Sequence, residues 1–301
     1  MDIAILSRGP QLYSTQSLYK AGRARGHNMS IIDHTLCNLV IEDGHPEIYY
    51  EGQPIRHYDA VIPRIGASVT QQGAAVITHF ELMNVFTAAR ANALLLGRDK
   101  LRCLQQLQRQ GLSTPKTVAL GQHSDLWSAV NVLDGFPVVI KLLEGTHGIG
   151  VILCESMQQT ESTVEAFQRL KERVIMQEFI KEAKGADIRA LVVAGEVVAS
   201  MKRQAQKGEF RSNLHRGASA SAEKLTQAEI NMVIRATKAV GLSVAGVDLL
   251  RSERGPLIME VNASPGLEGI ETTTGINVAA KIIQFIEKKV RERRRAQAKL
   301  R

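Results

Sequence analysis

The segment from residue 245 to residue 262 constrains the fold most strongly, because it predicts an antiparallel β-hairpin that carries acidic side chains. Strand-forming residues 245–251 and 257–262 flank the cluster Ser252-Glu253-Arg254-Gly255-Pro256. Glycine and proline in that cluster favour a turn and end both runs. We therefore expect an antiparallel strand pair in the C-terminal half of the chain.

Three polar residues of this hairpin are predicted to converge. If the turn is centred on Arg254, Asp248 pairs with Glu260, and Asn262 projects from the same face because side chains alternate along a strand. Opposed carboxylates repel unless a cation lies between them. Carboxylate and amide oxygens without nearby cysteine or histidine favour Mg²⁺ or Mn²⁺ over zinc. The alternative is a solvated hairpin with incidental acids.

The overall composition is that of a globular protein that occupies the cytoplasm. A length of 301 residues allows two or three compact units, and a hydrophobic content of 44% is ordinary. The longest apolar runs, such as residues 93–96, are far shorter than the roughly 20 residues of a membrane span. The start, residues 1–7, lacks the features of a secretory signal. Cys37, Cys103 and Cys154 are scattered and predict reduced thiols.

Positive charge is concentrated at the C-terminus. Residues 287–301 contain eight basic and two acidic residues, a net charge of +6, which leaves +2 for the rest of the total of +8. One interpretation is a solvated, fraying helix end, where cations complement the helix dipole. The other is an electrostatic contact with an acidic partner or RNA, which would weaken steeply with salt.

The N-terminal unit, residues 1–96, alternates short apolar strands with helices. The predicted elements are strands at 3–6, 29–32 and 60–63 and a helix at 17–25. This alternation favours a largely parallel sheet covered by helices. No G-x-G-x-x-G follows the first strand, so the unit has no dinucleotide-binding fingerprint.

A unit boundary is predicted near residue 97. Asp99 is placed to cap a helix over residues 100–110, which Gly111 ends. We predict three further segments: a second α/β unit at 97–175, a larger unit with the hairpin at 176–287, and the basic tail at 288–301.

A glycine-rich loop joins predicted strands at 137–142 and 151–153. P-loops and Rossmann turns lead from a strand into a helix, so this loop is neither. Its glycines permit close approach to phosphates and a closing flap, although a glycine-rich hairpin is also an ordinary turn. Lys141 ends an apolar run beside the loop; it either extends toward solvent or binds an anion, and we favour a phosphate. The flap glycines are Gly145, Gly148 and Gly150.

Three further polar segments are candidates for nucleotide contacts. Gln177-Glu178-Phe179-Ile180 offers hydrogen bonds and an aromatic ring to an adenine, or is an ordinary strand end. Asp187 suits a ribose hydroxyl or a turn cap. The tripeptide Arg211-Ser212-Asn213 lies in a polar loop, and Arg203, Arg211 and Arg216 are candidates to stabilise a transferring phosphoryl group.

The order of these elements resembles the ATP-grasp superfamily, in which two α/β subdomains clamp ATP. The resemblance covers about residues 97 to 285. It implies a mixed α/β (α+β) protein with a small Rossmann-like pre-ATP-grasp domain at the N-terminus. Three segments of the amino-acid sequence are similar to segments of the RimK group of ligases, which add glutamate to a small-subunit ribosomal protein. The segments are Pro63-Arg64-Ile65-Gly66, Arg211-Ser212-Asn213-Leu214-His215-Arg216-Gly217 and Glu260-Val261-Asn262-Ala263-Ser264-Pro265-Gly266-Leu267-Glu268-Gly269-Ile270-Glu271.

The resemblance implies roles for particular residues. Asp248 and Glu260 would hold one Mg²⁺ or Mn²⁺ ion, and Glu260 and Asn262 a second. Lys141 and Arg211 would neutralise charge during catalysis. The residues implied in ATP binding are Lys100, Lys141, Glu178, Phe179, Asp187, Arg211, Ser212 and Asn213.

The reaction implied by the resemblance is ATP-dependent amide formation. A carboxylate attacks the γ-phosphate, and the amine of glutamate captures the resulting acyl phosphate, which releases ADP and phosphate. A closed flap would exclude water from the acyl phosphate. The implied acceptor is the C-terminus of the sixth small-subunit ribosomal protein, and a homo-oligomer is expected. The alternatives are glutamate ligation to a small cofactor, peptide or carrier protein, and a non-catalytic protein that binds RNA or ribosomes through its tail.

Overall fold

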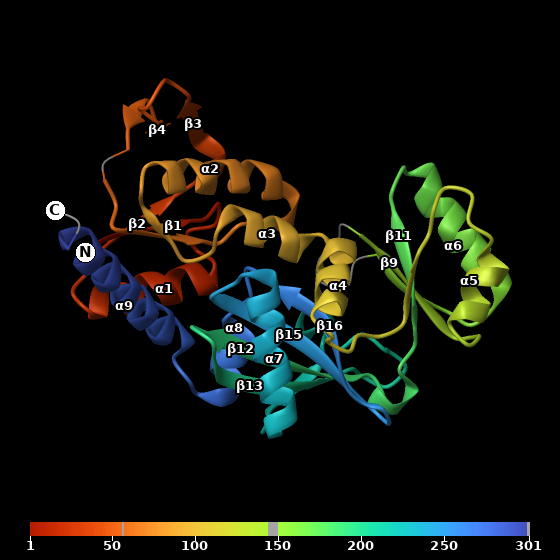
Figure 1. Cartoon of the computed structure of the whole chain (residues 1–301). Helices are drawn as coiled ribbons and strands as arrows, with labels where there is room; N and C mark the ends of the chain where they lie inside the picture. Colours follow the sequence, from red (N-terminus) through yellow and green to blue (C-terminus); the bar gives the residue numbers. More distant parts are fainter. Residues whose placement is uncertain (56, 144–149, 300–301) are drawn as a thin grey trace.

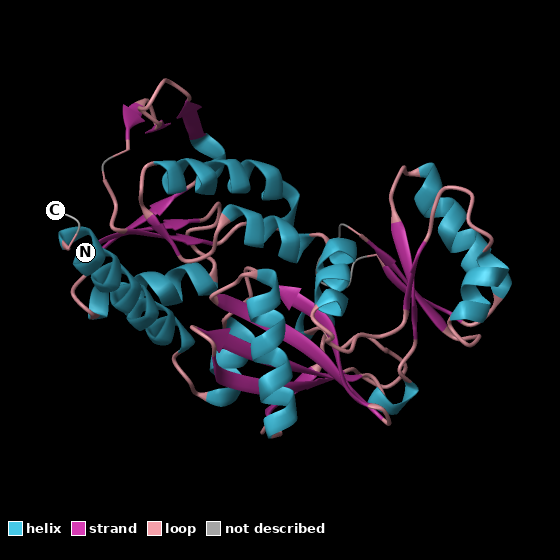
Figure 2. Ribbon diagram, in the orientation of Figure 1, coloured by secondary structure: helices cyan, strands magenta, loops and turns pink. Residues whose placement is uncertain are grey.

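The computed structural model describes residues 1–55, 57–143 and 150–299, which form three units (Figure 1). The N-terminal unit has a sheet of order β2-β1-β6-β7 in which every neighbouring pair is parallel, as predicted. Helices cover both faces of this sheet (Figure 2). Its elements are β1 (Asp2–Leu6), α1 (Tyr13–Ala24), β2 (Asn28–Ile32), β6 (Ala60–Pro63), α2 (Thr70–Leu82), β7 (Phe86–Thr87) and α3 (Ala91–Arg98).

The predicted strands of this unit agree with the structure to within one residue, whereas helix α1 begins four residues earlier than predicted. The residue before the helix, Leu12, makes no side-chain capping bond, so no capping signal marks the start. A small antiparallel sheet between β2 and β6 was not predicted. It consists of β3 (Cys37–Val40), β4 (Glu47–Tyr50) and β5 (Gln53–Pro54).

The central unit is a separate antiparallel sheet of order β10-β9-β11-β8 with two helices on one face (Figure 1). The expected boundary at residue 175 falls inside β11. Gly145 and Gly148 of the flap lie outside the described residues, while Gly150, with a φ of +70°, directly precedes the return strand β10. The elements are β8 (Thr117–Ala119), α5 (Leu126–Val132), β9 (Val138–Leu142), β10 (Val151–Cys154), α6 (Met157–Arg169) and β11 (Val174–Glu178).

The C-terminal unit is a five-stranded antiparallel sheet of order β14-β13-β12-β15-β16. Helix α4 begins at the predicted cap, where Asp99 Oδ1 accepts a hydrogen bond from Arg102 N at 3.0 Å. This helix packs on α7 and β16, so residues 100–109 belong spatially with the C-terminal sheet. The elements are α4 (Lys100–Arg109), β12 (Ala186–Val193), β13 (Glu196–Gln204), β14 (Ser219–Ala222), α7 (Gln227–Val240), β15 (Val244–Ser252), β16 (Gly255–Asn262), α8 (Glu268–Thr274) and α9 (Val278–Ala298).

The hydrophobic cores of the N-terminal and C-terminal units are continuous. Alternate residues of β1 face opposite layers: Ala4 lies in a cluster with α2, α7 and one face of β12, whereas Ile3 lies in a cluster with α1, α9 and the other face. The central unit has its own core, and only a small cluster around Leu104, Leu143 and Ile175 connects it to α4. The central unit is therefore the most separate part of the described chain.

The basic tail continues helix α9 and does not form a separate segment. Glu287 accepts hydrogen bonds from Arg25 at 2.7 Å and from His27 at 2.8 Å, and Arg294 pairs with Asp59. Val290 is buried against the N-terminal unit. The helix is therefore anchored rather than frayed at residues 290–294, which contact the N-terminal unit, although most side chains from residue 288 to residue 299 are exposed, as the solvated interpretation expects. No helix of the described chain is both long enough and apolar enough to span a membrane.

Candidate active site between the three units

A cavity of about 800 Å³ lies where the three units meet. Every residue predicted to bind ATP or a metal lines this cavity. Lys141 comes from the central sheet, Glu260 from the C-terminal sheet and Arg64 from the end of β6. The fold therefore brings together polar residues that are far apart in the sequence.

The hairpin of β15 and β16 has the predicted pairing of Asp248 with Glu260, although its turn differs from the prediction. The strands extend to Ser252 and Gly255, which leaves a two-residue turn instead of five residues. This register alone would pair Asp248 with Met259. A β-bulge after Asp248 inserts one extra residue and restores its pairing with Glu260.

Asp248 is held by two arginines, Arg189 on the adjacent strand β12 and Arg203 on β13, the next strand of the sheet. Arg189 Nε donates to Asp248 Oδ1 at 2.6 Å, and Arg203 Nη2 lies 3.0 Å from Asp248 Oδ2. Burial alone would raise the pKa of Asp248, but the charges and hydrogen bonds of Arg189 and Arg203 outweigh it and lower that pKa. Both carboxylate oxygens of Asp248 therefore already have cationic partners.

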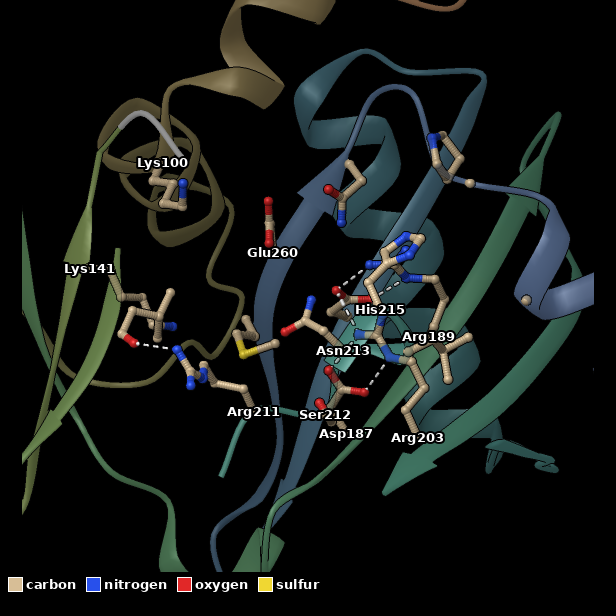
Figure 3. A pocket seen from close by; sticks show the side chains of 18 of the residues that line it. Lys100, Lys141, Asp187, Arg189, Arg203, Arg211, Ser212, Asn213, His215 and Glu260 are labelled. Atoms are coloured by element: carbon tan, nitrogen blue, oxygen red, sulfur yellow. Dashed lines mark hydrogen bonds and ion pairs between the residues drawn. The ribbon is translucent and has the colours of Figure 1, made fainter. Parts of the chain in front are cut away.

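Asp187 belongs to the same cluster (Figure 3). Its carboxylate is buried in β12 and accepts hydrogen bonds from Arg203 Nε at 2.7 Å and from Arg203 Nη2. The alternative of a turn cap is therefore wrong. The sequence interpretation missed Arg189, which lies opposite Asp248 in the register of β12 and β15. The one sequence signal for Arg189 is its position two residues after Asp187, which places both side chains on the same face of the strand.

Glu260 and Asn262 are the members of the predicted triad best placed for a cation. The Asn262 amide lies 3.2 Å from Glu260 Oε1 and 3.3 Å from Arg189 Nη2. Without a cation, the Asn262 side chain forms two hydrogen bonds when its amide nitrogen donates to Glu260 and its amide oxygen accepts from Arg189. A cation between Glu260 and Asn262 requires the amide oxygen on the Glu260 side. Carboxylate and amide oxygens in this arrangement fit a hard ion such as Mg²⁺.

Two lysines face Glu260 across the cavity (Figure 3). Lys141 Nζ donates to Gln177 Oε1 at 2.6 Å, and Lys100 Nζ donates to the Leu143 carbonyl at 3.2 Å. Lys141 lines the cavity, so the alternative of an extension to bulk solvent is not observed. Burial lowers the pKa of Lys141 to about 8, and the charge of Lys100 contributes. An anion bound between these lysines would favour the charged form of Lys141 and so raise its pKa again.

Aromatic residues and Arg211 form another part of the cavity wall. The rings of Phe179 and Phe210 meet edge to face with centroids 6.3 Å apart. Arg211 Nη2 lies 2.7 Å from Glu209 Oε2, and Arg211 Nη1 donates to the Val151 carbonyl of the central unit at 3.3 Å. Hydrogen bonds from Arg211 hold the pKa of Glu209 at about 2.

Glu178 contacts the hairpin instead of an open surface. Its carboxylate accepts hydrogen bonds from the Lys116 backbone N–H and from the guanidinium of Arg254 at the hairpin tip. Ser212 is buried, and it lines the cavity together with Asn213. The Glu178 carboxylate is therefore already engaged. The backbone groups of this segment and the ring of Phe179 are the part of the cavity wall that suits a flat heterocycle.

Comparison with known proteins identifies the family. Residues 97–286 match the RimK-like ATP-grasp domain, and residues 1–94 match the RimK PreATP-grasp domain. The chain belongs to the RimK-like ATP-grasp family. A probable alpha-L-glutamate ligase of Pseudomonas aeruginosa is 56% identical over 288 residues, 96% of each chain. A probable alpha-L-glutamate ligase of Pseudomonas fluorescens is 55% identical over the same length and shares.

Solved structures agree on the fold of this RimK-like ATP-grasp protein. The ATP-grasp ligase PsnB, complexed with a minimal precursor, has a TM-score of 0.74 at 19% identity and covers 95% of this chain and 98% of its own. A D-alanine–D-alanine ligase of Bacillus anthracis complexed with ATP has a TM-score of 0.71 at 18% identity, covering 99% of each chain. The predictions of the fold and of an ATP-grasp carbon–nitrogen ligase are confirmed.

Proposed function

We propose that the protein is an ATP- and Mg²⁺-dependent ligase that joins the amine of glutamate to an acceptor carboxylate through an acyl phosphate. The observation that carries this proposal is the single cavity in which Lys100 and Lys141 face Glu260 and Asn262. Cations on one wall and oxygen ligands on the other suit the phosphates of a nucleotide and its metal. The names of the relatives from Pseudomonas support glutamate as the substrate that supplies the amine.

Each part of the cavity wall has a distinct role in this proposal. Phe179 packs on the adenine, and Lys100 and Lys141 bind phosphate oxygens. Glu260 and Asn262 would hold Mg²⁺, and the bound ion would neutralise negative charge on the phosphates. The second ion of the predicted pair would compete with the positive charges of Arg189 and Arg203, which already contact both oxygens of Asp248.

The chemistry requires activation of a carboxylate, which is a poor electrophile at neutral pH. Its oxygen attacks the γ-phosphorus of ATP, and ADP leaves. The glutamate amine then attacks the acyl carbon, phosphate leaves, and a proton is lost from nitrogen. Lys141 and Arg211 stabilise the transferring phosphoryl group through their positive charge. The flap, which includes Gly150, keeps water from the acyl phosphate.

We propose the C-terminus of the sixth small-subunit ribosomal protein as acceptor and a homo-oligomeric enzyme in the cytoplasm, both through membership of the RimK-like family. A small cofactor, peptide or carrier protein is the competing acceptor. The test is mass spectrometry of the ribosomal protein after incubation with enzyme, ATP, Mg²⁺ and glutamate. Glutamate-sized mass increments that require both ATP and glutamate are expected. ADP release with a small acceptor, and no increment on the ribosomal protein, would overturn this acceptor.

A further inference from the structure

Two arginines at the N-terminal end of the cavity differ from the other cavity arginines. Arg64 directly follows β6 and Arg98 ends α3, and both line the cavity. Arg189, Arg203 and Arg211 each form an ion pair with a carboxylate. Within residues 1–55, 57–143 and 150–299, neither Arg64 nor Arg98 has such a partner; each donates a side-chain hydrogen bond to a backbone carbonyl.

These hydrogen bonds bring both guanidinium groups to one place. Arg64 Nη2 donates to the Pro265 carbonyl at 2.8 Å, and Arg98 Nη2 donates to the Ile65 carbonyl at 2.6 Å. Two buried polar atoms nearby have no hydrogen-bond partner in the described chain, Arg98 Nε and Ser264 Oγ. Because Ser264 precedes Pro265 and also lines the cavity, unpaired donors gather at this point.

The electrostatics call for an anion here. Burial, together with the smaller effect of the charge of Arg98, lowers the pKa of Arg64 to about 10. Burial also lowers the pKa of Arg98, against which only Glu260 acts. Both side chains stay protonated at neutral pH, so two half-buried positive charges face the cavity without an ion-pair partner among the described residues. A carboxylate is the planar anion that guanidinium groups bind best.

The topology supports a ligand at this point. Strands β1 and β6 are parallel neighbours, and the helices that follow them lie on opposite faces of the sheet. In parallel α/β sheets, ligands bind at the carboxyl ends of two neighbouring strands whose following helices lie on opposite faces of the sheet. Arg64 stands at that end of β6. A Cβ on Gly246 would lie 2.8 Å from Pro265 Cβ, so this glycine lets the Ser264 loop approach β15 over the cavity.

We propose that Arg64, Arg98 and Ser264 bind the unreacted carboxylates of the amino acid that supplies the amine, an inference that rests on the proposed function. Those carboxylates keep their charge throughout the reaction, so a fixed pair of cations suits them. The acceptor carboxylate instead has to reach the phosphates near Lys141 and Glu260. A dicarboxylic amino acid would place two negative charges against the two arginines, which accounts for selection of glutamate.

The test uses Arg64→Gln and Arg98→Gln in steady-state kinetics with ATP and glutamate varied separately. Loss of one charged hydrogen-bonding group predicts a KM for glutamate raised by about 10- to 100-fold, with the KM for ATP unchanged within about twofold. Inhibition by glutarate, a dicarboxylate without the amine, should weaken by a similar factor. The matched control is Arg235→Gln, because exposed Arg235 also donates to a backbone carbonyl, that of Gln110 at 2.7 Å, outside the cavity.

Thermal unfolding with glutarate keeps this test independent of turnover. Glutarate should raise the unfolding temperature of the wild-type protein and of Arg235→Gln but not of Arg64→Gln or Arg98→Gln. An unchanged glutamate KM in both variants would overturn the subsite, and an increase confined to the KM of the acceptor would assign it to the acceptor carboxylate instead. Glutarate stabilisation without any glutamate turnover would refute the proposed function and leave the anion site standing.

Discussion

The ionisation of Lys141 provides a sharp test of the phosphate site. Lys141 is half-buried in the wall of the cavity, and this burial moves its pKa from an ordinary 10.5 to about 8. Only the charged form attracts phosphate, so the free enzyme loses affinity for ATP as the pH rises through about 8. The pH dependence of kcat/KM reports the free enzyme. We expect kcat/KM for ATP to fall tenfold per pH unit above that point, to about one-thirtieth of its plateau at pH 9.5.

The assay is ADP release at saturating glutamate and acceptor, with ATP varied from pH 6.5 to pH 9.5. The value of kcat should change less over this range, because bound phosphates stabilise the charged lysine and raise its pKa. Lys141→Arg is the matched control, since a guanidinium stays protonated throughout. Its kcat/KM for ATP should be lower at neutral pH, owing to the different shape of the group, and flat above pH 8.

A wild-type profile that is flat to pH 9.5, or the same inflection in Lys141→Arg, would exclude Lys141 as the titrating phosphate ligand. The first result would mean that Lys141 does not contact ATP in its charged form. The second would assign the inflection to another group, and Lys100 is then the candidate, because it lies on the same side of the cavity and donates to the Leu143 carbonyl.

Three further changes test other parts of the structure. Glu260→Gln should reduce ADP release at least 100-fold, since it removes the charge that holds Mg²⁺, while circular dichroism stays unchanged; normal release would exclude Glu260 as a ligand. The pKa of Glu287 falls from 4.5 to about 2 beside Arg25, so its pairing stabilises the fold above pH 4.5 and is lost toward pH 2. Glu287→Gln should therefore lower the free energy of unfolding in urea by about 3 kcal/mol at pH 7, whereas Glu292→Gln, on the exposed face of the same helix, should have a much smaller effect; equal effects would refute the docking of α9. Gly246→Ala should lower stability by about 1–3 kcal/mol and raise the KM for glutamate, because its Cβ would displace Pro265; an unchanged KM would contradict this account.

Local patterns predicted the elements well, because a strand or a capped helix depends on neighbouring residues. The strand of residues 60–63 and the helix that Asp99 caps are both present. The pairing of Asp248 with Glu260 was also predicted, but for an incomplete reason, since a bulge that no local signal marks compensates for a shorter turn.

Contacts between distant segments were not predictable in the same way. Arg189 meets Asp248 only because β12 pairs with β15 in one register, and nothing local to either strand sets that register. Arg64 stood out only within a segment that resembles the RimK group, and no local pattern singled out Arg98. Their significance depends on the cavity that they share and on the lack of an ion-pair partner in the described chain. The docking of the basic helix depended on Glu287, whose partners Arg25 and His27 lie some 260 residues away.

The way the units are joined bears on how such an enzyme would work. The C-terminal sheet, with Glu260, shares a continuous core with the N-terminal unit, with Arg64, so these two sites keep a fixed separation. The central unit, with Lys141, is joined by a small apolar cluster and by polar contacts such as that of Arg211 with the Val151 carbonyl. We infer that bound ATP, held from both sides, supplies much of the attraction that closes the central unit over the cavity. The amino acid site would then be preformed, whereas the phosphate site would be completed only when nucleotide binds. Stabilisation by glutarate should accordingly be independent of ATP, while access of a protease to the central unit should fall on addition of ATP and Mg²⁺.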